Sequence, residues 1–155
     1  MLKNLFKFVR FLKDVIDANK DPLNMDAEHL FTFEGVDVIY SKHALRRTAN
    51  IVAGITTFGI ILVDDIFMEL PEDVQKAILY HEIGHSVYED LSVCNIKDRS
   101  LENEQNADAY GLVKGLSKQC VIDMLVAVKE AQYKATGIKR NKEIDQRIEY
   151  IKSNF

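Results

Sequence analysis

The residues best suited to chemistry in this sequence are two histidines and a glutamate in one short stretch. His81 and His85 are four positions apart, so in a helix their rings lie on the same face, one turn apart, and both can reach one metal ion. Glu82 points partly around the helix, close enough to contact a water molecule on that ion without ligating it. The pattern therefore indicates two metal ligands and a general base beside an activated water.

The sequence places this stretch in a predicted helix over residues 71–90. Pro71 suits the first helical position, and Glu72 and Asp73 face the positive end of the helix dipole. Gly84 costs about 1 kcal/mol relative to alanine inside a helix, which indicates a neighbour packed too closely for a Cβ atom. The alternative is a core helix with two hydrogen-bonded histidines, but it gives no reason for a carboxylate on the inner side of a buried helix.

A catalytic zinc ion takes three protein ligands and leaves a fourth position for water, so a third ligand must come from elsewhere. Glu104 lies on the next predicted helix, 104 − 85 = 19 residues after His85, which is enough chain to bring a second helix alongside the first. Asp108 shares the face of Glu104 and can accept a hydrogen bond from the far nitrogen of a ligand histidine. The small Ala107 allows the helices to approach. The alternative is an exposed acidic face on a polar helix.

Composition predicts one soluble globular domain over residues 1–155, with 47% apolar and 28% charged residues. The formal net charge of −4 argues against binding to nucleic acid. Two cysteines, Cys94 and Cys120, are too few for a disulfide framework and indicate a reducing compartment. No apolar run is long enough to span a membrane, and no signal-peptide pattern is present, so a cytoplasmic location is expected.

The N-terminal half reads as a helix followed by a small sheet. Residues 2–18 form a predicted amphipathic helix that docks on the protein's own core, with contact to a membrane surface as the alternative. Residues 30–40 read as two short strands joined by a tight turn at Glu34-Gly35, or as one bulged strand. Residues 49–63 read as two strands or one bent strand that ends in a solvated acidic turn at Asp64-Asp65.

The C-terminal half, residues 100–155, is predicted to be helical, so the fold class is α+β with the sheet packed on the helix over residues 71–90. Helices are expected over about residues 100–115, 117–137 and 141–153. In the last helix, the inward positions are Ile144, Ile148 and Ile151. The expected solvated face carries Glu143, Arg147 and Lys152.

At this point the chain resembles the gluzincin zinc metallopeptidases, whose pattern is HExxH followed by ExxxD or ExxAD. It looks most like the minimal cytosolic members of prokaryotes and their viruses, and the resemblance covers roughly residues 50–112. It implies a zincin-like fold, Glu104 as the third zinc ligand, and Asp108 as support for His81. It also implies that a strand before the metal-binding helix forms the upper edge of the cleft.

One departure from the family concerns the group that stabilises the oxyanion. Larger gluzincins place a histidine, tyrosine or arginine from a C-terminal subdomain there, but no histidine follows His85 in this chain. The oxyanion stabiliser is therefore left unassigned among several candidates, which are Arg99, Tyr110, Tyr133, Arg140, Arg147 and Tyr150.

The expected function is a zinc-dependent endopeptidase with one zinc ion per chain and a peptide or protein as substrate. Two alternatives stay open. One is a zinc-binding regulatory or structural protein that acts on one dedicated partner, and the other is a different zinc-assisted amide hydrolase.

Residues 58–63 are the last strand-like run before the metal-binding helix. They are predicted to form an edge strand that holds an extended peptide through main-chain hydrogen bonds. The residues expected nearest the peptide are Phe58, Gly59, Ile60 and Ile61, and Gly59 would let a peptide backbone come close. The alternative is a fully buried central strand.

Overall fold

The computed structural model describes residues 27–41, 52–56, 59–88, 100–137 and 141–155. Four strands are followed by helices, so the chain has the expected α+β fold. The strands are β1 (Ala27–Phe33), β2 (Val36–Ser41), β3 (Ala53–Ile55) and β4 (Ile60–Val63). The helices are α2 (Asp65–Glu69), α3 (Glu72–Val87), α4 (Leu101–Val113), α5 (Lys118–Thr136) and α6 (Lys142–Asn154). The helix predicted over residues 2–18 lies outside the described residues.

The sheet has the strand order β1-β2-β4-β3. Strands β1 and β2 form an antiparallel hairpin whose turn has positive φ at Glu34 (50°) and Gly35 (81°), the pattern of a two-residue type I′ turn. The tight turn expected at these two residues is therefore confirmed. Strand β2 pairs in parallel with β4, and β4 pairs antiparallel with β3, so β3 and β4 are two separate strands and not one bent strand.

The acidic pair after β4 is not the solvated turn that the sequence suggested. Asp64 is only 1% exposed, and its carboxylate accepts hydrogen bonds from the main-chain N–H groups of Ile66 and Phe67. It therefore caps the short helix α2, whose first N–H groups have no partner within the helix. The hydroxyl of Tyr40 on β2 donates to Asp65, which fastens α2 to the sheet.

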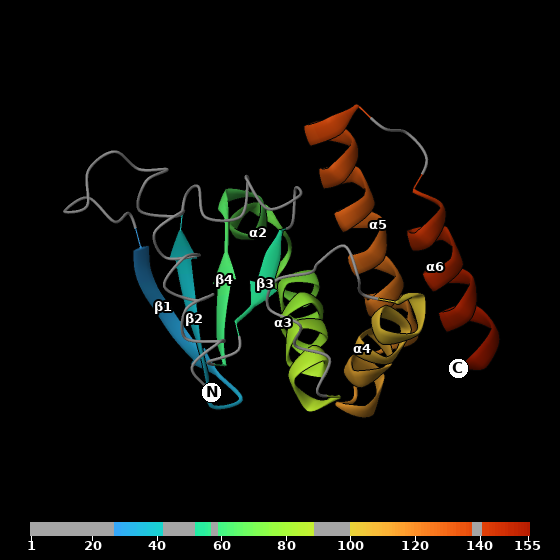
Figure 1. Cartoon of the computed structure of the whole chain (residues 1–155), viewed down its shortest axis with the longest axis horizontal. Helices are drawn as coiled ribbons and strands as arrows, with labels where there is room; N and C mark the ends of the chain where they lie inside the picture. Colours follow the sequence, from blue (N-terminus) through green and yellow to red (C-terminus); the bar gives the residue numbers. More distant parts are fainter. Residues whose placement is uncertain (1–26, 42–51, 57–58, 89–99, 138–140) are drawn as a thin grey trace.

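Helix α3 lies between the sheet and the other long helices, as Figure 1 shows, and it contacts β3, α4 and α5. Pro71 is the cap of this helix and not its first residue, a difference of one position from the expectation. Nine residues of α3 are buried, so the helix is apolar on more than one side, as a helix packed on both sides must be. Side chains of α3 can therefore contact residues of the N-terminal sheet and residues of the C-terminal helices.

The C-terminal helices begin where the sequence predicts. Ser100, Ser117 and Asn141 cap α4, α5 and α6, and α5 ends at Gly137 in the left-handed conformation. The core of this half is formed by side chains that are fully or almost fully buried, which are Val121, Met124, Leu125, Ile144 and Ile151. Among the described helices, none is long and apolar enough to cross a membrane.

Candidate metal centre

Helix α3 carries two of the three side chains that meet at the candidate site. His81 and His85 are one turn apart, and their Nε2 atoms lie 3.0 Å from each other. The ring planes are nearly perpendicular, at 87°. His85 is fully buried, while the His81 side chain keeps 11% of its surface exposed. Each ring therefore presents one nitrogen to the same small volume at the helix surface.

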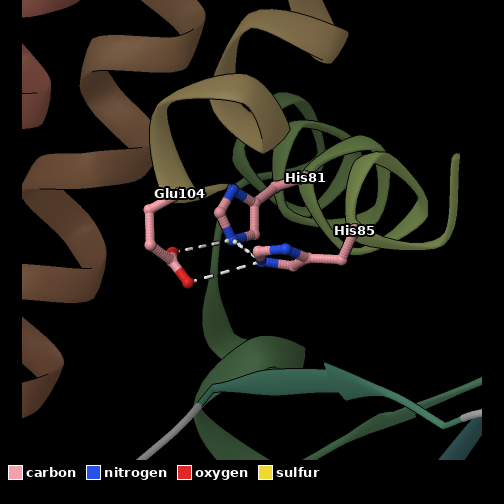
Figure 2. A group of neighbouring side chains, drawn as sticks. All are labelled: His81, His85 and Glu104. Atoms are coloured by element: carbon pink, nitrogen blue, oxygen red, sulfur yellow. Dashed lines mark hydrogen bonds and ion pairs between the residues drawn. The ribbon is translucent and has the colours of Figure 1, made fainter. Parts of the chain in front are cut away.

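Glu104 on α4 completes the group. Its Oε2 atom is 3.5 Å from Nε2 of His81, and its Oε1 atom is 3.6 Å from Nε2 of His85. One ligand atom from each of the three residues lies within 4.8 Å of the others, and Figure 2 shows the three side chains converging. Two imidazole nitrogens and a carboxylate oxygen arranged in this way could hold a metal ion.

Helices α3 and α4 can pack closely enough to bring these ligands together because Gly84, the residue of α3 at their contact, has no side chain. A Cβ atom added at Gly84 would lie 2.9 Å from the Cα atom and 3.0 Å from the carbonyl oxygen of Ala107, and 3.0 Å from Cβ of Tyr110. The neighbour that the mid-helix glycine predicted is thus the backbone of α4. Ala107, which is fully buried, is small enough to allow the approach.

Asp108, one turn after Glu104, contacts the opposite side of the His81 ring. The Nδ1 atom of His81 is 2.8 Å from Oδ1 of Asp108, so the ring donates there and leaves Nε2 facing Glu104 and His85. Burial disfavours the charged imidazole, but the hydrogen bond to Asp108 and its negative charge outweigh burial and raise the pKa of His81. A proton and a metal ion would compete for this ring.

Arg147 of α6 is also part of the site, and here the sequence-based expectation was wrong. It was placed on the solvated face of its helix, yet it is only 7% exposed. Its Nε and Nη2 atoms donate to the two oxygens of Asp108 over 2.8 and 2.7 Å, and Nη1 is 2.9 Å from Oε2 of Glu104. A signal was present, because position 147 falls three residues after Ile144 and four before Ile151, on the apolar stripe of α6.

The opposite charges of Asp108 and Arg147 shift the pKa values of both side chains. Burial alone would raise the pKa of Asp108, but the positive charge and hydrogen bonds of Arg147 outweigh it and lower that pKa. Burial likewise disfavours the guanidinium, and the negative charge of Asp108 outweighs it, so the pKa of Arg147 is raised. Asp108 is therefore a carboxylate in the folded protein and accepts the hydrogen bond from His81.

Glu82, the predicted general base, is 5% exposed and lies against the edge of the sheet. Its Oε2 atom accepts a hydrogen bond of 3.0 Å from the main-chain N–H of Ile55 on β3. Thr56 donates its N–H to the carbonyl of Ile60 in β4, and the carbonyl of Val52 accepts from Asp64, directly after β4. The odd-numbered residues of β3 therefore turn their main-chain groups away from β4. The outer edge of β3 thus holds the Glu82 carboxylate, a contact made by the backbone that side-chain patterns do not reveal.

The expected edge strand over residues 58–63 is not at an edge. Strand β4 pairs with β2 on one side and with β3 on the other, so Ile60 and Ile61 have sheet neighbours on both sides. Gly59 directly precedes β4 and has a positive φ of 71°, a conformation that glycine adopts without strain. Its N–H donates to the carbonyl of Thr56. Phe58 lies outside the described residues. Strand β4 is thus a central strand, as in the alternative, but it is not fully buried, because Ile60 and Leu62 are only partly buried.

The remaining oxyanion candidates are not brought to the metal group by any contact in the described residues. Tyr110 packs edge-on against the rings of Tyr80 and Tyr88, and Tyr150 against that of Phe155. Tyr133 is exposed on α5. Arg99 and Arg140 lie outside the described residues.

Comparison of the chain with protein-family models, with curated proteins and with solved structures finds no match.

Proposed function

We propose that this protein is a zinc-dependent peptidase whose metal ligands are His81, His85 and Glu104. The observation that carries the proposal is the convergence of their ligand atoms within 4.8 Å, with Glu82 next to the first ligand in the sequence. Two histidines and one glutamate are a ligand set typical of catalytic zinc sites, which keep a further position open for water or substrate. One zinc ion per chain is proposed.

In this proposal, His81, His85 and Glu104 would hold a zinc ion, which would supply Lewis-acid activation of the scissile carbonyl and of a water molecule. Glu82 accepts the proton of the attacking water and returns it to the leaving amine. The hydrogen bond from Ile55 to one carboxylate oxygen of Glu82 restricts the rotation of that carboxylate. Asp108 keeps the Nδ1 side of His81 occupied, so that Nε2 is the nitrogen available to the metal.

The gluzincin resemblance and a zincin-like fold belong to the same proposal. They are supported by the sheet on one side of α3, the helices on its other side, and a second helix that supplies Glu104 and Asp108. A peptide or protein substrate follows from this class of site. The low cysteine count, with Cys120 a free thiol, supports a cytoplasmic location.

The metal assignment is tested by elemental analysis of the purified protein. We expect close to one zinc ion per chain in the wild type and a large loss in Glu104→Ala, which removes a ligand. Glu102→Ala is the matched control, because Glu102 is exposed on the same first turn of α4. Equal zinc content in the wild type and Glu104→Ala would remove Glu104 from the ligand set.

The catalytic assignment is tested with a diverse set of quenched fluorescent peptides. Glu82→Gln has nearly the same shape and removes only the base, so it should retain zinc and lower kcat/KM by about 10²–10⁴-fold. Glu72→Gln, an exposed position at the start of the same helix, should leave kcat/KM unchanged.

The alternatives predict different results. Stoichiometric zinc with no cleavage of any peptide would favour a zinc-binding regulatory or structural protein. Cleavage of simpler amides in preference to peptides would favour another zinc-assisted amide hydrolase. Peptide cleavage by Glu82→Gln at the wild-type rate would contradict the proposed mechanism.

A further inference from the structure

Arg147 connects the last helix of the chain to two carboxylates of the candidate metal centre. The guanidinium meets Asp108 with two parallel hydrogen bonds, from Nε to Oδ2 (2.8 Å) and from Nη2 to Oδ1 (2.7 Å). Its third nitrogen, Nη1, lies 2.9 Å from Oε2 of Glu104. One side chain from α6 thus contacts both a proposed metal ligand and the residue that orients another ligand.

Charge explains why a cation is needed at this position. Glu104 and Asp108 are both buried, and two carboxylates removed from water destabilise the fold strongly unless a cation or a metal ion compensates them. Arg147 is the only lysine or arginine that is buried among the described residues. It therefore compensates the carboxylates in the metal-free protein, and it does so from a helix that begins 34 residues after Asp108.

Geometry also limits what Arg147 can do. The planar guanidinium has five N–H groups in a fixed arrangement, which suits two carboxylates held at a set angle. Here all three nitrogens face carboxylate oxygens of α4, and Nη1 also lies 3.8 Å from Oε1 of Glu143 on its own helix. This occupancy disfavours the oxyanion role for which its residue type had made it a candidate. It favours a role exerted through Glu104 and Asp108.

We propose that Arg147 is a positioning residue that sets the orientation of the Glu104 carboxylate directly and of the His81 ring through Asp108. The metal affinity of the centre then depends on the docking of α6, which supplies no ligand itself. This inference rests on the metal site of the proposed function but not on peptide cleavage.

Arg147→Lys separates position from charge. Removing the cation altogether would have two opposed effects, because a positive charge repels a metal ion while its hydrogen bonds hold the ligands in place. Lysine keeps the charge and loses the two-pronged contact with Asp108. A lower metal affinity in this variant would therefore report the loss of orientation.

The experiment measures zinc affinity by competition with a chromophoric chelator, and the visible absorption spectrum of the Co²⁺-loaded protein. We expect Arg147→Lys to bind zinc about 10–100-fold more weakly and to give an altered Co²⁺ spectrum, as changes around metal ligands do. Lys129→Ala is the control, since Lys129 pairs with Asp145 at the exposed contact of α5 and α6. It should keep both wild-type values.

A purely structural role would lower the melting temperature of Arg147→Lys but leave the zinc affinity and the Co²⁺ spectrum of the folded protein unchanged, and that result would overturn the inference. Arg147→Gln is measured in parallel in case the lysine variant does not fold. Its Co²⁺ spectrum is the readout, because that spectrum depends on ligand geometry and not on repulsion between the cation and the metal, and we expect it to be altered. A wild-type Co²⁺ spectrum in Arg147→Gln, or failure of both variants to fold, would also overturn the inference. A wild type that binds zinc and cuts no peptide would contradict the proposed function alone. Peptide cleavage together with an unaltered zinc affinity in Arg147→Lys would contradict this inference alone.

Discussion

Helix α4 is joined at its middle and at its C-terminal end to elements far from it in the sequence, each time by a pair of opposite charges. In its middle, Asp108 meets Arg147 of α6, 39 residues further along the chain. At its C-terminal end, Lys114 meets Glu34 in the turn between β1 and β2 over 3.0 Å, 80 residues away in the sequence. The side chains of Asp108 and Arg147 are 0% and 8% exposed, and those of Lys114 and Glu34 are 33% and 42% exposed.

This difference in burial separates what the two pairs can do. At the surface, water and salt screen the charges, and holding two long side chains together costs entropy, so such a pair contributes little to stability. A buried pair must have its hydrogen bonds satisfied, because losing one partner leaves an uncompensated charge away from water. The buried pair therefore fixes the directions of its groups, and it is the one that stands beside the candidate metal ligands.

The largest expected effect comes from removing the buried carboxylate. Asp108→Asn keeps the shape of the side chain but removes the anion that Nε and Nη2 of Arg147 contact, and leaves Glu104 as the nearest carboxylate of that guanidinium. This change should lower the free energy of unfolding of the metal-free protein by about 3–5 kcal/mol. It should also weaken zinc binding by about 10–100-fold, because the uncharged amide oxygen is a weaker hydrogen-bond acceptor for Nδ1 of His81 than the carboxylate. Denaturant unfolding in the presence of a chelator measures the first effect, and chelator competition measures the second.

Asp145→Asn is the matched control for that change. Asp145 makes an ion pair with Lys129 between α5 and α6, and its side chain is 52% exposed. The same substitution there should leave zinc affinity unchanged and alter stability only slightly. Equal losses of stability in the two variants would mean that burial does not separate the pairs as described.

A smaller effect is expected from widening the contact between α3 and α4. Gly84→Ala should gain about 1 kcal/mol of helix propensity. The added Cβ atom, however, would meet the Cα atom of Ala107 at 2.9 Å and its carbonyl oxygen at 3.0 Å, and backbone atoms cannot move aside as a side chain can. We expect a net destabilisation of about 1–3 kcal/mol, measured by denaturant unfolding, and weaker zinc binding as Glu104 shifts.

Gly111→Ala provides the comparison for that variant. The nearest atom to a new Cβ there is Cδ1 of Leu116 at 3.1 Å, the end of a flexible side chain. Stability should therefore change little or rise through the better helix propensity of alanine. If Gly84→Ala were as stable as Gly111→Ala, the close approach of the two helices would not be what requires the glycine.

The sequence could indicate those residues of the candidate metal centre whose proposed roles follow from local spacing. His81 and His85 share a face because they are four apart, and Glu104 and Asp108 share a face for the same reason. The single turn at Glu34-Gly35 and the serine caps of α4 and α5 are local as well. Each of these patterns spans only a few residues, so the sequence displays it directly.

The features that escaped prediction depend on pairings across long stretches of chain. Arg147 was assigned to the solvated face because it follows Glu143 at i+4 in a charged pattern, and only the tertiary contact with α4 makes its burial favourable. Strand β4 was expected at an edge because it is the last strand-like run before α3 and because of the family resemblance, but no local pattern says which strands will flank it. The hydrogen bond from Ile55 to Glu82 uses a backbone group that every residue except proline carries, so no residue type signals it.

The smallest expected effect concerns the exposed pair, and it tests the comparison from the other side. The hydrogen bond from Lys114, and then its charge, lower the pKa of Glu34 below its ordinary value of 4.5. A carboxyl whose pKa is lowered by folding stabilises the folded state above its unfolded pKa, and this contribution is lost as the pH falls through the folded value. Glu34→Gln should therefore lower the melting temperature by about 2 °C or less at pH 7, and by less still at pH 3. Added salt should reduce the difference in melting temperature at pH 7, because dissolved ions screen this exposed pair.

Zinc affinity should not change in Glu34→Gln, since Glu34 contacts Tyr80 and Lys114 and none of the proposed ligands. Melting curves at the two pH values, with and without salt, measure this. A loss at pH 7 as large as that of Asp108→Asn would contradict the view that burial decides what each pair contributes.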